Sequence, residues 1–197
     1  RLDLNDINCR KAKEKGIKVN FVDINDDGTL DMEDLNKKIN KKTKLVTCVH
    51  ASNVVGMIND VREIGKIAHE KDALFLVDGA QSVPHMPVDV KKIDCDFLAF
   101  SGHKMLGPMG SGALYGKKEI LENMNPFLGG GDMIREVRLE NSTWNELPWK
   151  FEAGTPSVGD GIAFGAAIDY LTKIGMDSVR KHEEKLLAYG FERFSEL

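Results

Sequence analysis

The sequence has little cysteine, no excess of basic charge and no long hydrophobic run, and each shortage excludes a class of protein. Its 197 residues contain 3 cysteines, Cys9, Cys48 and Cys95, which form neither a CxxC pair nor a metal-ligand spacing. No stretch approaches the roughly 20 apolar residues that a membrane span needs. A formal net charge of -4 provides no basic surface for nucleic acid or an anionic membrane.

The cysteines also indicate the compartment in which the protein works. An odd number of cysteines without a disulfide framework favours a reducing environment. Cys48 lies in the apolar run LVTCV and Cys95 in IDCDFLAF, so we interpret both as buried, reduced thiols. The first residues, RLDLNDINCRKAKEKG, carry too much charge for a signal peptide. We therefore expect a cytoplasmic protein with neither a membrane nor a nucleic-acid partner.

Short β-branched runs alternate with amphipathic stretches in the first part of the chain. This alternation predicts an α/β fold, in which a mostly parallel sheet lies between helices in a three-layer α/β/α arrangement. The predicted strands cover residues 17–22, 45–49, 74–78, 96–100 and 112–116, and the predicted helices cover 32–39 and a segment capped by Asn59 or Asp60. Right-handed crossovers place the carboxyl ends of parallel strands at one edge, where ligands of such sheets bind.

Beyond Lys117 the composition changes. Glycine, proline and aromatic residues are frequent in NPFLGGGDMI and LPWKFEAGTPSVG, which predict ordered loops. Two long helical patterns follow, and much of the apolar content of the second comes from Leu186, Leu187, Tyr189 and Phe194. The chain begins with Arg rather than Met and stops inside a helical pattern, so we expect it to be a fragment.

Polar residues gather at or just beyond the predicted strand ends. They are Asn53 after the second strand, Asp78 and Gln81 at and after the third, and Ser101, His103 and Lys104 after the fourth. Unpaired polar groups in a dry site cost free energy, so we expect these side chains to share a ligand.

An acid, an amide, a hydroxyl, an imidazole and a lysine together fit pyridoxal phosphate. A lysine amine forms a Schiff base with the aldehyde of this cofactor, and a carboxylate keeps its ring nitrogen protonated so that the ring accepts electrons. Asp78 and Lys104 are the candidates for these two roles, and Ser101 and His103 offer donors to the phosphate. A P-loop fits poorly, because GHKMLGPMGSG lacks the GK[ST] ending.

A longer set of motifs carries a family resemblance. The chain resembles the group II (Suf-type) cysteine desulfurases and selenocysteine lyases in the run DALFLVDGAQSVPHMPVDVKKIDCDFLAFSGHKMLGPMGSGALYGKK, in HASNVVG before it, and in GGGDMI and WKFEAGTPSVG after it. These enzymes are similar to class V aminotransferases and have fold type I of pyridoxal-phosphate enzymes. The resemblance implies part of the large cofactor-binding domain over residues 1–160, and helices leading into a truncated small domain over 161–197.

The resemblance also implies roles for individual residues around the cofactor ring. Lys104 resembles the Schiff-base lysine that later acts as the proton-transfer base, and Asp78 resembles the partner of the ring nitrogen. Gln81 resembles the residue that hydrogen-bonds the ring hydroxyl. Asn53 matches an asparagine near that hydroxyl and the substrate carboxylate.

At the phosphate end, Ser101 and His103 resemble the ligands of the cofactor phosphate. Thr155, in AGTP, matches a residue that reaches the phosphate of the neighbouring subunit. The resemblance therefore implies a homodimer whose active site is shared between subunits. It implies no metal site.

The function that the resemblance implies is cysteine desulfuration. L-cysteine would become L-alanine while an enzyme cysteine takes the sulfur as a persulfide, which supplies iron–sulfur cluster assembly through a Suf-type acceptor protein. The family also carries an earlier phosphate loop and ring-stacking histidine, and a later persulfide-forming cysteine and substrate-binding arginine. None of these has a counterpart among the present residues, so the chain resembles the middle of such an enzyme.

Several alternatives remain open from the sequence. A selenocysteine lyase acting on L-selenocysteine, a kynureninase-like protein or a class V aminotransferase would use the same cofactor. A non-catalytic scaffold would use none. The segment Asp23–Asp34 fits the spacing of a calcium-binding EF-hand loop, but its last position is Asp rather than Glu, and the preceding residues IKVNFV predict a strand rather than a helix. We interpret it as an acidic turn.

Overall fold

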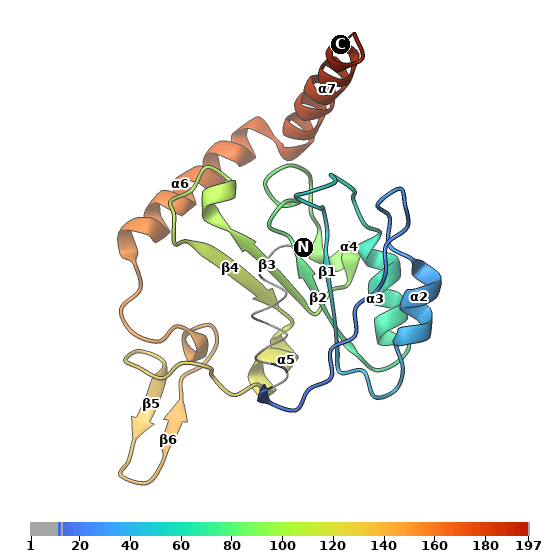
Figure 1. Cartoon of the computed structure of the whole chain (residues 1–197). Coiled ribbons are helices and arrows are strands. Elements are labelled where there is room, and N and C mark those ends of the chain that lie inside the picture. The colour runs from blue at the N-terminus through green and yellow to red at the C-terminus, as the bar shows by residue number, and fades with distance from the viewer. Residues whose placement is uncertain (1–11, 13, 197) are drawn as a thin grey trace.

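A four-stranded sheet forms the centre of the computed structural model, which describes residue 12 and residues 14–196 (Figure 1). Its strands are β1 (Leu45–Val49), β2 (Leu74–Asp78), β3 (Phe97–Ser101) and β4 (Gly112–Gly116), in that order across the sheet. β1, β2 and β3 run parallel, and β4 pairs antiparallel with β3. The predicted α/β fold class with a mostly parallel sheet is therefore confirmed.

Three helices, α2 (Met32–Lys38), α3 (Val61–His69) and α4 (Val90–Ile93), pack on one face of the sheet. Each follows an aspartate whose carboxylate accepts a backbone N–H of the first helical turn. Apolar residues of α3 lie at helical spacing against the sheet, and Gly65 leaves room for the ring of Phe75. The core consists of Leu35, Ile39, Val46, Val61, Ile64, Ala68, Ala73, Phe75, Val77, Ile93, Cys95 and Leu98.

The opposite face of the sheet is partly open among the described residues. Strand register aligns Leu45 with Leu74 and Val49 with Asp78, so these four side chains share that face. The leucines and Val49 are between 38% and 47% exposed. Asp78 therefore ends β2 on the open face, while the intervening Phe75 and Val77 are buried under the helices.

After β4 the chain leaves the sheet. A short helix and a hairpin come first, and two long helices follow (Figure 1). The elements are α5 (Lys118–Asn123), β5 (Ile134–Val137), β6 (Ser142–Trp144), α6 (Val158–Ile174) and α7 (Met176–Phe194), with two short 3₁₀ segments, η1 (Gly102–Lys104) and η2 (Trp149–Phe151). Within the described part of the chain, no helix is long and apolar enough to cross a membrane.

The predicted strand over residues 17–22 is wrong. The structure assigns no strand there, and Ile17, Val19 and Phe21 are between 39% and 56% exposed. β-Branched residues favour a strand only where a neighbouring strand can pair with them. No described strand pairs with this segment, so its local preference is not realised.

Elsewhere the differences are smaller. β3 lies one residue later than predicted, so Ser101 is its last residue rather than the first beyond it. The β5–β6 hairpin between the two predicted loops was missed, because IREVRLENSTW has neither strict alternation nor an Asn-Gly or Asp-Gly turn. The predicted strands 45–49, 74–78 and 112–116 and the cap at Asp60 are confirmed.

The acidic segment before α2 forms a turn whose carboxylates bond within the chain. An isolated bridge joins Ile24 to Leu30. Asp27 accepts hydrogen bonds from the backbone and hydroxyl of Thr29. Asp34 accepts from the backbone of Asp23 and pairs with Lys38 at 2.6 Å. Among the described residues, no group of three His, Cys, Asp or Glu side chains is placed to hold a metal ion.

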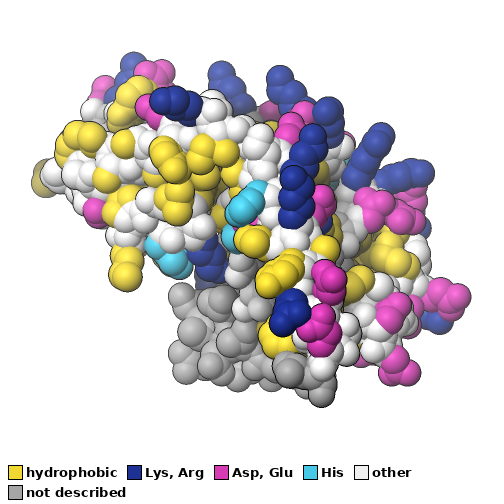
Figure 2. Space-filling view, turned by 90° about the horizontal axis from the view of Figure 1, so that it is seen from above, with side chains coloured by type: hydrophobic (Ala, Val, Ile, Leu, Met, Phe, Trp, Pro, Cys, Tyr) yellow, Lys and Arg dark blue, Asp and Glu magenta, His cyan; other side chains and the backbone are white. Residues whose placement is uncertain are grey.

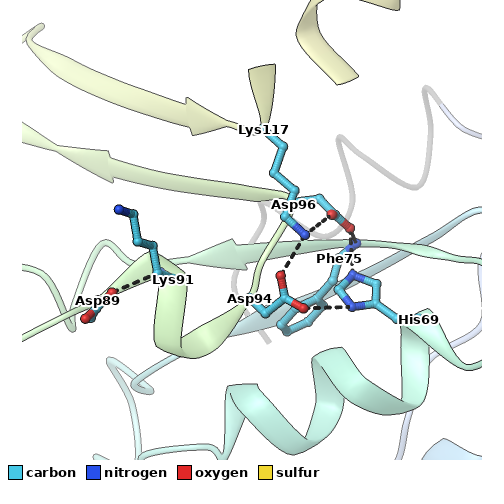
Figure 3. A network of polar contacts seen from close by, with 7 residues as sticks. All are labelled: His69, Phe75, Asp89, Lys91, Asp94, Asp96 and Lys117. Atoms are coloured by element: carbon cyan, nitrogen blue, oxygen red, sulfur yellow. Dashed lines mark hydrogen bonds and ion pairs between the residues drawn. The ribbon is translucent and has the colours of Figure 1, made fainter. Parts of the chain in front are cut away.

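A polar network around Asp96 stabilises the end of the sheet opposite Asp78, at the amino ends of β2 and β3 (Figure 3). Asp96 is 4% exposed and accepts a hydrogen bond from the backbone N–H of Phe75 at 2.7 Å. Its carboxylate also lies 2.9 Å from His69 Nε2 and 2.9 Å from Lys117 Nζ. Lys117 donates a further bond to Asp94 at 2.8 Å, so the network joins α3, β2 and the ends of β3 and β4.

The charges in this network stabilise each other against burial. Burial alone would raise the pKa of Asp96, but hydrogen bonds from Lys117, His69 and the Phe75 backbone outweigh it and hold that pKa below its ordinary value of 3.8. Burial opposes the charge of Lys117 as well, yet Asp94 and Asp96 hold the pKa of Lys117 above its ordinary value. Both groups are therefore charged near neutral pH.

Replacing Asp96 with Asn should lower the free energy of unfolding at pH 7 by about 3 kcal/mol, because Lys117 loses a buried counter-charge. The folded-state pKa of Asp96 is lowered, so its contribution is complete above the unfolded-state pKa of about 3.9 and is lost as the pH falls below that value. Urea unfolding of wild type and Asp96→Asn should therefore show a smaller difference at acid pH.

The matched control is Asp94→Asn, since Asp94 pairs with the same lysine but its side chain is 67% exposed. We expect a loss below about 1 kcal/mol for this variant. Equal losses in the two variants would show that the buried carboxylate has no special role.

Candidate active site

Asp78 lies at the edge of the sheet formed by the carboxyl ends of the parallel strands, and one of its two carboxylate oxygens accepts a hydrogen bond. It ends β2 between Val49 of β1 and Ala99 of β3, and it is half-buried. Its Oδ1 accepts a hydrogen bond from the backbone N–H of Ala80 at 2.9 Å. Among the described residues no donor bonds its other oxygen. An ionised carboxylate accepts several hydrogen bonds, so Asp78 can still bind a donor on a ligand.

The chain turns sharply after Asp78 and carries Gln81 to the same edge. The turn begins at Gly79, where a Cβ atom would come within 3.0 Å of Val83 and 3.3 Å of the Ala99 carbonyl oxygen. The backbone N–H groups of Ser82 and Val83 bond to the Gly79 carbonyl, which closes the turn. Gln81 is half-buried, and its amide makes no hydrogen bond to another described residue.

The loop after β3 is closed on itself and presents His103 and Lys104 to solvent. Gly102 donates to the Ser111 carbonyl at 2.8 Å and accepts from the N–H groups of Met105 and Gly107. A Cβ atom at Gly102 would overlap the Ser111 hydroxyl, so a larger residue there would force the Ser111 side chain to move. Within the part of the chain that the structure describes, the Lys104 amine makes no hydrogen bond or ion pair, and neither does the His103 ring.

Asn53 and Thr155 occupy different surroundings. Asn53 is exposed in the turn after β1, where the Ser52 hydroxyl accepts from the N–H groups of Val54 and Val55. Thr155 is exposed on the loop between η2 and α6, next to Gly154, which bonds to Gly131. The structure thus brings six of the seven predicted site residues to one sheet edge, while Thr155 lies on a separate loop.

The polar groups at this edge fit pyridoxal phosphate. The cofactor needs a carboxylate with a free oxygen at one end, and an amine with hydrogen-bond donors at the other. Asp78 has the free oxygen, and Lys104 has an unpaired amine after the neighbouring strand. Ser101 and His103 lie beside Lys104 on the same closed loop. The residues present therefore match the group that the sequence predicts.

Sequence reasoning missed a groove that links this edge to α7. The groove has a volume of about 280 Å³ and is lined by Ala51, Ser52, Gln81, His85, Arg180, Glu183, Glu184 and Leu187. Across it, His85 Nδ1 lies 2.7 Å from Glu183 Oε1. These residues are 98 positions apart, and no local pattern could have paired them.

The two described cysteines have the character of inert thiols. Burial, with a smaller effect of Asp78, raises the pKa of Cys48 to about 12. Burial is also the main cause that raises the pKa of Cys95, which is fully buried. Both are free of disulfides. The sequence-based interpretation is confirmed for Cys95. Cys48 is a free thiol as predicted but is half-buried rather than buried, and Cys9 lies outside the described residues.

Comparison with known proteins gives one consistent family. Residues 6–197 match the family described as aminotransferase class-V. A curated cysteine desulfurase from Haloferax volcanii is 55% identical over 185 residues, which is 94% of this chain and 43% of that protein.

Solved structures agree with this match. An apo cysteine desulfurase from Thermococcus onnurineus superposes with a TM-score of 0.90 at 44% identity, covering 95% of this chain and 47% of that one. A cysteine desulfurase from Escherichia coli superposes with a TM-score of 0.83 at 39% identity, covering 86% of this chain and 43% of that one. The chain spans less than half the length of each of these relatives.

Cys48 and Cys95 should resist alkylation in the folded protein. With a pKa of about 12, Cys48 has a thiolate fraction of about 10⁻⁴ at pH 8, against roughly a quarter for an unperturbed thiol. Iodoacetamide treatment followed by peptide mass spectrometry measures each cysteine separately, and the guanidinium-unfolded protein is the control in which both react. Fast labelling of Cys48 before unfolding would contradict its assigned burial.

Proposed function

The chain belongs to the class-V aminotransferase family, and on that premise we propose that it forms part of a pyridoxal-phosphate-dependent cysteine desulfurase. One observation carries the proposal. Asp78 ends β2 with a free carboxylate oxygen, and Lys104 follows the neighbouring parallel strand β3 with an unpaired amine. The relatives from Haloferax volcanii and Thermococcus onnurineus are both named cysteine desulfurases, which supports this choice of reaction.

Each residue at the edge has a task in this proposal. When bound, pyridoxal phosphate supplies an aldehyde and a ring that accepts electrons from the α-carbon of the substrate. Lys104 would hold the aldehyde end of the cofactor, and its amine would carry the proton that leaves the α-carbon of the substrate. Asp78 keeps a proton on the ring nitrogen through its free oxygen. Gln81 donates to the ring hydroxyl.

The remaining residues position the two ends of the site. Ser101 and His103 donate hydrogen bonds to the cofactor phosphate, which needs several donors to offset its charge. Asn53 orients the carboxylate of the substrate. We further propose a homodimer, in which the exposed Thr155 reaches the phosphate in the other subunit.

The proposed reaction moves one sulfur atom and needs no external oxidant or reductant. The carbon–sulfur bond of L-cysteine breaks, a sulfur–sulfur bond forms on an enzyme thiol, and L-alanine and a persulfide result. Cys48 and Cys95 are unsuited to this role, because a nucleophilic cysteine needs a lowered rather than a raised pKa. A Suf-type acceptor protein then takes the sulfur for iron–sulfur cluster assembly.

Lys104→Ala, made in the complete protein, should abolish covalent attachment of added pyridoxal phosphate, because the attaching amine is gone. Borohydride reduction followed by peptide mass spectrometry should place the phosphopyridoxyl group on the peptide containing Lys104 in wild type only. Lys91→Ala, at an exposed lysine of α4, is the control and should keep the adduct. A reduced adduct on another lysine in wild type would sink the assignment.

Asp78→Asn should retain bound cofactor but lower kcat by about 10²–10³-fold, because an amide cannot keep the ring nitrogen protonated. The substitution preserves the hydrogen bond from Ala80, so the turn should stay intact. Steady-state alanine production measures kcat, with Asp89→Asn at the cap of α4 as the control. Turnover of Asp78→Asn at the wild-type rate would rule out the proposed role of this carboxylate.

A further inference from the structure

α7 is attached to the rest of the molecule by few contacts. None of its residues is buried, and Leu186, Leu187, Tyr189 and Phe191 are between 56% and 69% exposed. Figure 1 shows α7 extending beyond the sheet. The neighbouring helix α6 carries several exposed apolar side chains, and hydrophobic side chains gather on this part of the surface in Figure 2. Among the described residues, the contact between His85 and Glu183 is the one side-chain hydrogen bond that joins α7 to another element.

The segment that carries His85 is continuous with the proposed cofactor site. Four hydrogen bonds close consecutive turns from Gly79 to Met86: Ser82 and Val83 donate to the Gly79 carbonyl, and His85 and Met86 donate to the Ser82 carbonyl. Ser82 and Pro84 are buried within this segment. Gln81 is four residues before His85, and both side chains line the same groove. The hydrogen-bonded turns make Gln81 and His85 part of one connected segment.

Apolar contacts meet the same segment from its other side. A second cavity, of about 180 Å³, lies between Val83, Met86 and Val88 of this segment and residues of α6 and α7 that include Leu171 and Met176. The segment 79–88 is thus one place where α6 and α7 meet the rest of the molecule, and Phe164 of α6 also packs against Phe100 of β3. The contact between His85 and Glu183 holds the side of the segment next to Gln81, whereas the cavity leaves the packing on its opposite side incomplete.

We propose that His85 and Glu183 are positioning residues, which couple the placement of α7 to the placement of Gln81 against the cofactor ring. The inference rests on the proposed function, because Gln81 is the residue assigned to the ring hydroxyl. Neither His85 nor Glu183 touches the reacting atoms in this proposal. A movement of α7, caused by closure of the site over the substrate or by binding of a partner protein, would then alter the orientation of the cofactor.

The neighbouring Glu184 provides a matched control. Its carboxylate pairs with Arg180 at 2.8 Å, one turn earlier on the same helix, and makes no bond to the segment 79–88. Glu183→Ala and His85→Ala remove the link between helix and segment. Glu183→Gln keeps the oxygen acceptor and His85→Asn keeps a nitrogen at the Nδ1 position, so these two variants should restore the contact.

Hydrogen exchange of the complete protein without cofactor tests the coupling independently of catalysis. In Glu183→Ala and His85→Ala, amides of residues 79–88 should exchange about two- to fivefold faster, the range expected for a partly exposed pair. Glu184→Ala, Glu183→Gln and His85→Asn should exchange at the wild-type rate. Equal acceleration in Glu183→Ala and Glu184→Ala would overturn the proposal.

A second measurement on the cofactor-loaded protein separates positioning from mere support. Glu183→Ala should lower kcat by about two- to fivefold and shift the visible absorption of the bound cofactor, with KM little changed and with rescue by Glu183→Gln. If Glu183→Ala shows faster amide exchange but wild-type kcat and absorption, the contact only stabilises the segment, and its positioning role is overturned. If wild type binds no pyridoxal phosphate, the proposed function and the positioning role both fail, while the exchange result still decides whether the pair holds the segment.

Discussion

Parallel pairing of β1, β2 and β3 sets Val49, Asp78 and Ala99 side by side, so the loops after these strands leave the sheet at one edge. The register of these pairs depends on the packed face, where Phe75 and Val77 are completely buried under the helices. A shift of one residue would expose these two side chains and turn Asp78 into the apolar core. Packing on one face of the sheet therefore selects the side chains that the other face offers to a ligand.

The two ends of the sheet use aspartates in opposite ways. Asp96, at the amino ends of the strands, is buried and has His69, Lys117 and a backbone N–H as partners. Asp78, at the carboxyl edge, has a single backbone donor within the described chain. A fully paired carboxylate stabilises the fold, whereas a half-paired one, with an unpaired lysine after the next strand, has bonds left for a ligand. This difference separates the structural end from the candidate active site more clearly than burial does.

Local sequence signals predicted the parts of the molecule that local interactions determine. LVTCV, LFLVD and GALYG form the predicted strands, and Asp60 caps the predicted helix, because each has its own pattern and neighbours. IKVNFV has the same pattern but no described partner strand, so its preference has no effect. Asp78 and Lys104 could be named as candidate site residues because strand ends can be read from the sequence, and their roles stay predictions. The contacts of Glu183 with His85, and of Asp96 with His69, join distant positions and leave no local trace.

β1 is the last strand on its side of the described sheet, so one row of its backbone N–H and C=O groups lacks a neighbouring strand. Leu45 and Val49 are also exposed on its open face, which makes this strand a template for pairing with other polypeptides when the chain stands alone. Three lysines, Lys41, Lys42 and Lys44, come directly before it. Charges in that position repel a second copy of the same strand, as gatekeeper residues do beside hydrophobic strands that cannot be avoided. Those three ammonium groups therefore oppose the pairing of β1 with a second copy of itself.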